Sequence, residues 1–311
     1  MATILVTGAA GFIGSHTVDQ LLAASHQVIG VDNFRTGHRE NLSVALGNSR
    51  FQFHEADIAD DGVLSRLAAQ HRPAALIHLA ALVSVPESIA NPALNHRLTL
   101  HATQLVADAA RAHDVARIVF ASSAAVYGDV RDIPTPESAD KNPLSPYGTA
   151  KLASESILLD AALSRGTVAR CHRYFNVYGP RQDPRSPYSG VISIFCASLR
   201  AGNAPTIFGD GEQTRDFISV HDAARANVIA ATSPGISSGI ANICTGRAVS
   251  LNRVFALQRA HYPQSSSPLY ASPRAGDIRH SCGVPDKARA ELGFTPEVPL
   301  DAGLAELVRN N

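Results

Sequence analysis

The sequence begins with a short apolar run that leads into three closely spaced glycines. Residues 2–7 are typical of a buried strand, and Gly8, Gly11 and Gly14 follow directly. The residues after them carry the apolar spacing of an amphipathic helix: Ile13, Val18, Leu21 and Leu22. Glycines at a strand-to-helix turn let the backbone approach a pyrophosphate, whose charge then faces the helix N-terminus. The chain is therefore restricted to folds that open with a strand, a nucleotide-binding turn and a helix.

The end of the next apolar segment indicates which nucleotide this turn would bind. A second strand is expected at Gln27–Val31, and it ends in Asp32, eighteen positions after Gly14. A carboxylate at this point accepts hydrogen bonds from the adenosine ribose hydroxyls and repels a 2′-phosphate. We therefore expect NAD as the cofactor in preference to NADP. Arg35 argues the other way, because a guanidinium close to this site can bind the 2′-phosphate.

Strand and helix patterns continue to alternate along the chain. We expect strands at 51–54, 74–78, 116–121 and 167–173, and helices at 60–70, 92–113 and 147–165. This rhythm predicts an α/β fold, a doubly wound parallel Rossmann sheet with right-handed crossovers. Past residue 180 the periodicity is lower and proline more frequent. We expect an NAD-binding Rossmann domain at 1–175 and a smaller C-terminal α/β substrate domain at 176–311, with part of 215–245 returning to the first.

A proton-transfer group is expected where the fifth strand meets the following long helix. Tyr147 and Lys151 are four positions apart, which places both side chains on one helix face. A nearby ammonium favours the phenolate, so Tyr147 should ionise below its usual pKa of about 10 and act as a general base. Such a pair alone is usually a solvated surface pair, and Ser122-Ser123 alone is usually a turn cap. Beside a nucleotide site, however, Ser123, Tyr147 and Lys151 together indicate catalysis.

Composition argues against several other classes of function. The 27 Lys and Arg balance 27 Asp and Glu, which gives no strong field for nucleic acid or an anionic membrane. The 13 His form no metal-ligand spacing, and the scattered Cys171, Cys196, Cys244 and Cys282 favour a reducing compartment. No apolar run approaches the ~18 residues of a membrane span, and the N-terminal strand lacks a basic flank typical of signal peptides. We expect a cytoplasmic protein without a metal.

The ordered motifs resemble those of the extended short-chain dehydrogenase/reductases, and within them the nucleotide-sugar 4-epimerases of the UDP-glucose and UDP-N-acetylglucosamine type. They cover nearly the whole chain: GAAGFIG (8–14), Asp32-Asn33, Asp57-Ile58, HLAA (78–81), SSAAVYG (122–128), YGTAK (147–151), RYFNVYGP (173–180), FGDGEQTRDFISVHD (208–222) and RAGDIRHS (274–281). The resemblance implies a catalytic triad of Ser123, Tyr147 and Lys151. Tyr147 would take the C4 hydroxyl proton while NAD takes the C4 hydride, and the resulting 4-keto sugar would turn over before the hydride returns.

The resemblance also implies the binding residues. Those for the cofactor are Gly8, Gly11, Phe12, Ile13, Gly14, Asp32, Asn33, Asp57, Ile58, Leu79, Ala80, Ala81, Tyr147, Lys151 and Tyr174. Those for a UDP-sugar are Ser84, Ser123, Tyr147, Asn176, Arg215, Arg274, Asp277 and Ser281. Asn176, Arg215 and Arg274 would contact the diphosphate, since guanidinium groups suit phosphate oxygens, and Asp277 the uridine ribose. Residues 208–211 are expected to form a hairpin before the strand of Arg215.

Four positions bear on which subfamily of the resembled superfamily the chain is most similar to. Dehydratases and decarboxylases of the resembled superfamily carry acidic residues where this chain has Ala124 and Ala125, so the sequence favours plain epimerisation. Thr99 replaces a usual Asn, and Val83 replaces a Lys that is frequent in UDP-glucose-specific enzymes. A uronic-acid epimerase, a 4-ketoreductase or an idle NAD-binding regulator stay open as alternatives. In the resembled family, helices such as 92–113 and 147–165 form the interface of a homodimer.

Overall fold

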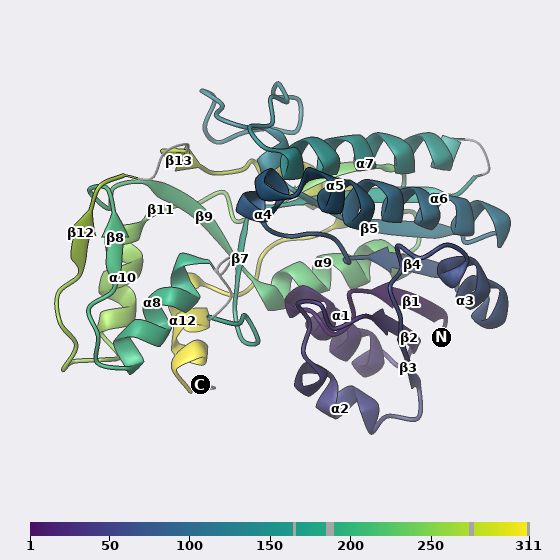
Figure 1. Cartoon of the computed structure of the whole chain (residues 1–311), viewed down its shortest axis with the longest axis horizontal. Coiled ribbons are helices and arrows are strands. Elements are labelled where there is room, and N and C mark those ends of the chain that lie inside the picture. The colour runs from purple at the N-terminus through teal and green to yellow at the C-terminus, as the bar shows by residue number, and fades with distance from the viewer. Residues whose placement is uncertain (164–165, 185–189, 274–276, 310–311) are drawn as a thin grey trace.

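The structure, a computed structural model, describes residues 1–163, 166–184, 190–273 and 277–309, and a parallel seven-stranded sheet forms its centre (Figure 1). The strand order is β10-β6-β5-β4-β1-β2-β3, and every neighbouring pair is parallel. The strands are β1 (Thr3–Thr7), β2 (Gln27–Asp32), β3 (Phe51–Glu55), β4 (Ala75–His78), β5 (Arg117–Ser123), β6 (Val168–Tyr174) and β10 (Gly239–Ile243). The predicted doubly wound α/β fold is confirmed, and all carboxyl ends of the strands meet at one edge.

Helices cover both faces of this sheet because its strands are apolar on both sides. Ile4 and Val6 of β1 join one buried cluster with residues of α1 (Phe12–Ala23) and α9 (Val220–Thr232). Leu5, between them, points to the opposite face. There it joins a second cluster with residues of α3 (Val63–His71), α6 (Ala102–Ala112) and α7 (Pro146–Leu163). Figure 1 shows α6 and α7 side by side over this face.

A smaller layer lies beyond the carboxyl ends of the strands, at the left of Figure 1. Its four-stranded sheet contains β7 (Asn176–Tyr178), β9 (Thr214–Ser219), β11 (Ala248–Ser250) and β13 (His280–Ser281). A two-stranded sheet pairs β8 (Thr206–Phe208) with β12 (Leu269–Ala271). The helices are α8 (Val191–Arg200), α10 (Leu251–Arg259) and α12 (Leu300–Arg309), which share a buried cluster around Phe195, Phe255 and Leu304. The chain passes between the layers more than once, since α9 packs on α1 and β10 pairs with β6.

The hairpin predicted at 208–211 is wrong. β8 pairs with β12 in parallel, whereas β9 pairs with β7, β11 and β13. Gly209 and Gly211 have φ of +85° and +77°, and between them Asp210 binds the Arg279 guanidinium through two hydrogen bonds of 2.9 and 2.7 Å. These interactions direct the turn from one sheet to the other instead of folding it back on β8.

The helix expected at 92–113 is continuous but not uniform. It consists of α5 (Pro92–Asn95), a π-helical turn at His96–His101 and then α6. A shorter helix, α4 (Val85–Ala90), comes directly before it. Single π turns inside α-helices occur frequently at functional sites. In the described parts of the chain, no helix is long and apolar enough to cross a membrane.

Candidate active site

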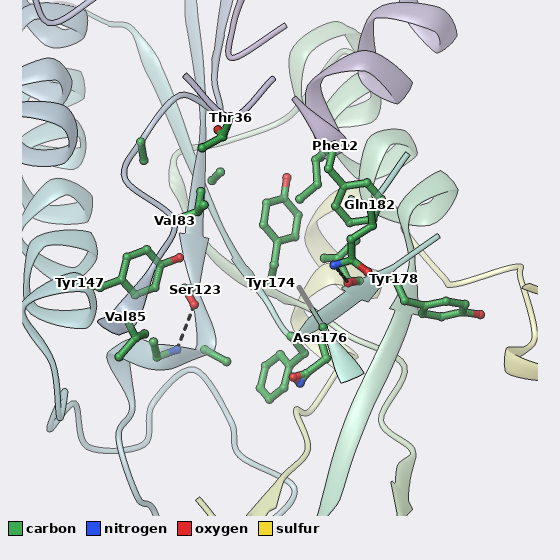
Figure 2. A pocket seen from close by; sticks show the side chains of 18 of the residues that line it. Phe12, Thr36, Val83, Val85, Ser123, Tyr147, Tyr174, Asn176, Tyr178 and Gln182 are labelled. Carbon is green, nitrogen blue, oxygen red and sulfur yellow. Dashed lines mark hydrogen bonds between the residues drawn. The ribbon is translucent and has the colours of Figure 1, made fainter. Parts of the chain in front are cut away.

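A cleft of about 1150 Å³ runs along the carboxyl ends of the parallel strands and on to the second sheet. In open α/β sheets this edge is where ligands bind. Most of the residues predicted for a site line this one cleft: Gly8, Gly11, Phe12, Ile13, Gly14, Asp32, Asn33, Asp57, Ile58, Leu79, Ala80, Ala81, Ser123, Tyr147, Lys151, Tyr174, Asn176, Arg215, Asp277 and Ser281. The cleft thus joins the glycine turn to the second layer through the Ser123 and Tyr147 region (Figure 2).

The glycine turn leaves room for no side chain at two of its positions. Gly8 has φ of +68°, and a Cβ on it would lie 2.8 Å from the amide nitrogen of Ala80. A Cβ on Gly14 would lie 1.9 Å from the carbonyl oxygen of Gly8. The N-terminus of α1 therefore sits directly against the ends of β1 and β4, with its amide groups toward the cleft. This cradle fits the pyrophosphate of a dinucleotide.

Asp32, the last residue of β2, is the second feature that fits a dinucleotide. Its Oδ2 accepts a hydrogen bond of 2.9 Å from the Ala10 amide, and its Oδ1 one of 2.8 Å from the Phe34 amide. The carboxylate lines the cleft, where it can also accept a hydrogen bond from a ribose hydroxyl. Burial raises the pKa of Asp32, and these backbone hydrogen bonds lower it. The residue is thus oriented for hydroxyl recognition by the backbone around it.

Other predicted cofactor residues lie around the same half of the cleft. Thr7 Oγ1 accepts hydrogen bonds from the amides of Leu79 and Ala80 at 3.2 and 3.3 Å, which fixes the small residues after β4. The Asp57 carboxylate faces the cleft but already binds Arg97 at 2.9 Å. The Tyr174 hydroxyl donates to Asn227, which leaves the ring of Tyr174 as a wall of the cleft (Figure 2).

Ser123, Tyr147 and Lys151 come together at the end of β5. Ser123 is the last residue of that strand, and its hydroxyl accepts a 3.2 Å hydrogen bond from the Ala125 amide. The Tyr147 hydroxyl points toward it from the first turn of α7 (Figure 2). Lys151, one turn further along, donates from Nζ to the Ala121 carbonyl oxygen at 2.7 Å and lies 5.8 Å from the Tyr147 ring centre. The structure therefore brings the three predicted catalytic side chains to one place.

The prediction that Lys151 lowers the pKa of Tyr147 is wrong for this structure. Burial raises the pKa of Tyr147, and the interaction of its hydroxyl with Ser123 lowers it. Burial also lowers the pKa of Lys151 to about 7, which the charge of Glu155 partly opposes. Desolvation disfavours the charged form of both groups, and the Lys151 ammonium is directed to a carbonyl oxygen. The spacing of two residues in the sequence predicts that their side chains are close, but it does not predict how strongly burial shifts their pKa values.

A buried polar network lies next to Lys151 and includes a residue that sequence analysis missed. Glu155 accepts hydrogen bonds from Nε and Nη2 of Arg173 at 2.9 and 2.7 Å. The Tyr127 hydroxyl accepts one of 3.0 Å from Arg173 and donates one of 2.6 Å to Asn242. Burial raises the pKa of Tyr127 to about 12. The sequence did contain a signal for Glu155, because this residue follows Lys151 by four positions and so lies on the same helix face.

The substrate-side predictions have a mixed outcome. Arg215 and Asp277, predicted to contact different parts of a ligand, bind each other at 2.6 Å, and Ser281 lies beside Arg215 in the β9–β13 pair. Ser84 is absent from the described lining of the cleft, because its buried hydroxyl accepts from the Glu87 amide at 2.9 Å and caps α4. Arg274 lies outside the described residues.

Sequence analysis also missed much of the second wall of the cleft. The residues concerned are Gln182, Val191, Ile194, Phe195, Ser198 and Thr206. Most of them belong to α8, whose pattern is that of an ordinary amphipathic helix, so no local signal distinguished them. Only Gln182 had a local sequence signal, since it follows the RYFNVYGP motif by two positions.

Comparison with known proteins agrees with this geometry. Residues 4–244 match the NAD dependent epimerase/dehydratase family. The chain belongs to this family. It is 39% identical over 311 residues to the UDP-glucose 4-epimerase of Mycolicibacterium smegmatis, covering 98% of this chain and 96% of the relative. The UDP-glucose 4-epimerase of Thermotoga maritima, solved with UDP-glucose, superposes with a TM-score of 0.93 at 38% identity over 99% and 98% of the two chains.

A third relative is named for a different UDP-sugar. The UDP-N-acetylglucosamine 4-epimerase of Methanobrevibacter ruminantium M1, solved with UDP-N-acetylmuramic acid, has a TM-score of 0.94 at 34% identity, covering 99% and 97% of the two chains. Together the comparisons confirm the predicted family: the protein is an epimerase, and NAD is its cofactor.

Two departures from the usual family pattern can now be placed in this epimerase. Val83 lies on the rim of the cleft, 51% exposed, where it offers an apolar surface. Thr99 is buried in the π-helical turn, and its hydroxyl accepts a 3.3 Å hydrogen bond from the Leu82 amide. Thr99 thereby holds the loop that follows β4 and carries the small residues Ala80 and Ala81.

Proposed function

We propose that this NAD-dependent UDP-sugar 4-epimerase interconverts UDP-GlcNAc and UDP-GalNAc through a 4-keto intermediate and also accepts UDP-Glc and UDP-Gal. One observation carries the proposal. The group of Ser123, Tyr147 and Lys151 stands where a dinucleotide cradle and a wall containing Arg215 and Ser281 share one cleft. A sugar held between them would have its reacting carbon beside a proton acceptor and beside the cofactor.

NAD, when bound, supplies an acceptor for the C4 hydride and the source from which the hydride returns. The glycine turn and the N-terminus of α1 would hold its pyrophosphate, and Asp32 its ribose hydroxyls. The chain's own task is to move one proton. Tyr147, starting as the phenolate, takes it at Oη from the sugar's C4 hydroxyl as the C4 carbonyl forms, and returns it to the same oxygen when the hydride is restored on the opposite face.

Ser123 and Lys151 assist that proton transfer in different ways. The Ser123 hydroxyl lies next to the phenol and lowers the pKa of Tyr147, which eases formation of the phenolate. Lys151 does not lower the pKa of Tyr147; its Nζ donates to the Ala121 carbonyl oxygen, which holds it 5.8 Å from the Tyr147 ring centre, where it would bind the cofactor beside the phenol. Lys151 is buried, whereas Ser123 lines the cleft and is only partly buried.

Ala124 and Ala125 support epimerisation over elimination. They follow Ser123 in a single 3-10 turn, and both line the cleft. Expulsion of water or carbon dioxide from the sugar needs an acid at this turn, and two methyl groups cannot transfer a proton. Return of the hydride to the 4-keto sugar is therefore favoured over loss of water or carbon dioxide.

The test uses the purified protein with whatever nucleotide it retains. It would be incubated separately with UDP-GlcNAc, UDP-Glc and UDP-glucuronic acid, and the products followed by proton NMR of the anomeric signals. We expect conversion to the C4 epimers of the first two, faster for the N-acetylated pair. Turnover of UDP-glucuronic acid alone would instead make the protein a uronic-acid epimerase, and no turnover with bound NAD would favour a regulator.

A further inference from the structure

Two buried side chains from the preceding helices hold the first turn of α7. Ser88, within α4, accepts a hydrogen bond from the Tyr147 amide at 3.2 Å. Asn95, at the end of α5, donates from Nδ2 to the Pro146 carbonyl oxygen at 3.0 Å. Ser88 is 0% and Asn95 3% exposed. The peptide group that joins Pro146 to Tyr147 is therefore fixed on both sides, because its N–H is hydrogen-bonded to α4 and its carbonyl oxygen to α5.

Both side chains are themselves fixed by further hydrogen bonds. The Ser88 hydroxyl donates to the Val85 carbonyl oxygen at 2.7 Å, so its lone pairs face the Tyr147 amide. Asn95 Oδ1 accepts a hydrogen bond from the Thr99 hydroxyl at 3.5 Å. The other end of the side-chain amide, the nitrogen, is therefore the atom that faces the Pro146 carbonyl oxygen. If the side-chain amide of Asn95 were rotated by half a turn, its Oδ1 would face the Pro146 carbonyl oxygen, and two acceptors cannot form a hydrogen bond.

These contacts are not needed to start the helix. Ser145 caps α7 by itself, accepting from the Gly148 amide at 3.2 Å through Oγ and from the Thr149 amide at 3.0 Å through its carbonyl. Pro146 is a favoured first residue, because it lacks an amide hydrogen and its φ already suits a helix. Ser88 and Asn95 instead determine where the helix begins relative to the rest of the cleft.

Of the three catalytic side chains, Tyr147 is the one whose place depends on this first turn. Ser123 belongs to β5, and Lys151 is bonded to the β5 residue Ala121. The central strand thus fixes two members of the group directly. The Tyr147 phenol reaches them from the other side, so any shift of its backbone changes its distance to both.

We propose that Ser88 and Asn95 are positioning residues that set the Tyr147 hydroxyl at its working distance from Ser123 and Lys151. The proposal rests on the proposed role of Tyr147 as proton acceptor. It also gives the irregular helix a purpose: Asn95 directly precedes the π-helical turn, and Thr99 within that turn holds both Asn95 and the Leu82 amide. One irregular turn thereby connects the loop after β4 to the helix of Tyr147.

The experiment compares Asn95→Ala, Asn95→Asp and Ser88→Ala with the control Asn91→Ala. Asn91 is an exposed residue one turn before Asn95 whose side chain caps α5 by accepting from the Leu94 amide at 3.0 Å. Asn95→Asp keeps the size of the side chain but turns an acceptor toward Pro146, so it tests the hydrogen bond without opening a cavity. Each purified holoprotein would be measured for kcat, KM, pH profile, bound NAD and melting temperature.

We expect kcat to fall at least tenfold in both Asn95 variants and in Ser88→Ala, with KM within twofold and bound NAD unchanged. A misplacement of about 1 Å costs of the order of 100-fold in rate. The pH at half-maximal kcat should also shift, because the surroundings of Tyr147 change. Asn91→Ala should keep kcat within twofold. Unchanged kcat and pH profile in Asn95→Asp and Ser88→Ala, with or without a lower melting temperature, would overturn the proposal. An inactive wild-type protein would instead refute the proposed function.

Discussion

The buried Nζ of Lys151 donates a hydrogen bond of 2.7 Å to the carbonyl oxygen of Ala121, a residue of strand β5 in the central sheet. The ammonium also lies 4.8 Å from the ring centre of Phe120. A lysine in so enclosed a place loses most of its hydration, and burial lowers the pKa of Lys151 to about 7. Neutral pH therefore lies near the point at which this group changes its charge.

The lowered pKa predicts a specific dependence of stability on pH. In the unfolded chain Lys151 has a pKa of about 10.4. Between pH 7 and 10 the unfolded state thus binds more protons, so the free energy of unfolding should rise with pH by up to ~1.4 kcal/mol per unit from this group. Lys151→Met, which keeps the length without the charge, should lack that rise. Urea unfolding at pH 7.5 and 9 checks this, and equal slopes in both proteins would contradict it.

Tyr147→Phe should separate catalysis from binding. The variant removes one hydroxyl from a half-buried ring on the cleft wall, so fold and bound NAD should be retained. Turnover should fall by ~10²–10⁴-fold, the usual contribution of a general acid–base group. The measurement is single-turnover conversion of UDP-GlcNAc, with NAD content determined after denaturation. If most activity remained, Ser123 would be the next candidate, because the Tyr127 hydroxyl is already held by Arg173 and Asn242.

The pairing of Arg35 with Glu87 predicts how NADP is rejected. Arg35 lines the cleft three positions after Asp32 and could bind a 2′-phosphate, but its guanidinium forms an ion pair with Glu87 of α4. Glu87→Gln should free Arg35 and remove a repelling charge, raising NADP affinity about five- to tenfold while NAD affinity stays constant. Glu55→Gln is the matched control, since it breaks the exposed Arg39–Glu55 pair with the same change of charge. Fluorescence titration of both nucleotides measures the effect, and equal responses of the two variants would refute it.

Much of this architecture could be predicted because it depends on local pattern. The glycine turn, Asp32 and the Tyr147–Lys151 spacing are each set by residues close together in sequence, and the parallel arrangement of the sheet follows from alternating strands and helices. Ser84 is missing from the described lining of the cleft because its hydroxyl caps the helix that starts next to it, a use that a motif does not reveal. The 208–211 hairpin was wrong because Arg279, nearly seventy positions away, binds the turn.

Distant contacts also explain what was missed at the site. The contacts of Ser88 and Asn95 with α7 span 59 and 51 positions of sequence. The second wall comes from a helix with an ordinary amphipathic pattern. The pKa of Tyr147 is governed by burial, which depends on every element around the cleft at once. Such features follow from packing in three dimensions, and spacing within a motif does not encode them.

We also propose that the protein is a homodimer through the helices at about 92–113 and 147–165. α6 and α7 lie side by side on the sheet, and Leu105, Leu152 and Ile157 on them are only partly buried. A second copy could cover these side chains. Light scattering at micromolar concentration should give about twice the 32.8 kDa chain mass. Leu105→Glu should shift the protein toward monomer, and a monomeric wild-type protein would contradict the proposal.

Ser281 provides the last prediction, which concerns the choice of sugar. It lies on the wall of the cleft next to Arg215, in the short strand β13. The resemblance implies that this position, four after Asp277, faces the C2 substituent of the sugar. A small Ser leaves space there for an acetamido group, whereas a Tyr ring would fill it. Overpacking a close-packed wall costs ~1–3 kcal/mol.

Ser281→Tyr should therefore change specificity and not general activity. Turnover of UDP-GlcNAc and UDP-GalNAc should fall tenfold or more, as ~1.4 kcal/mol implies, while turnover of UDP-Glc and UDP-Gal is kept. Ser281→Ala is the matched control, because it removes the hydroxyl without adding volume and should preserve both activities. The ratio of kcat/KM values for the two sugar pairs is the measurement. If Ser281→Tyr lowered both activities equally, or neither, a single wall residue would not determine the choice of sugar, and specificity would have to come from the α8 side of the cleft.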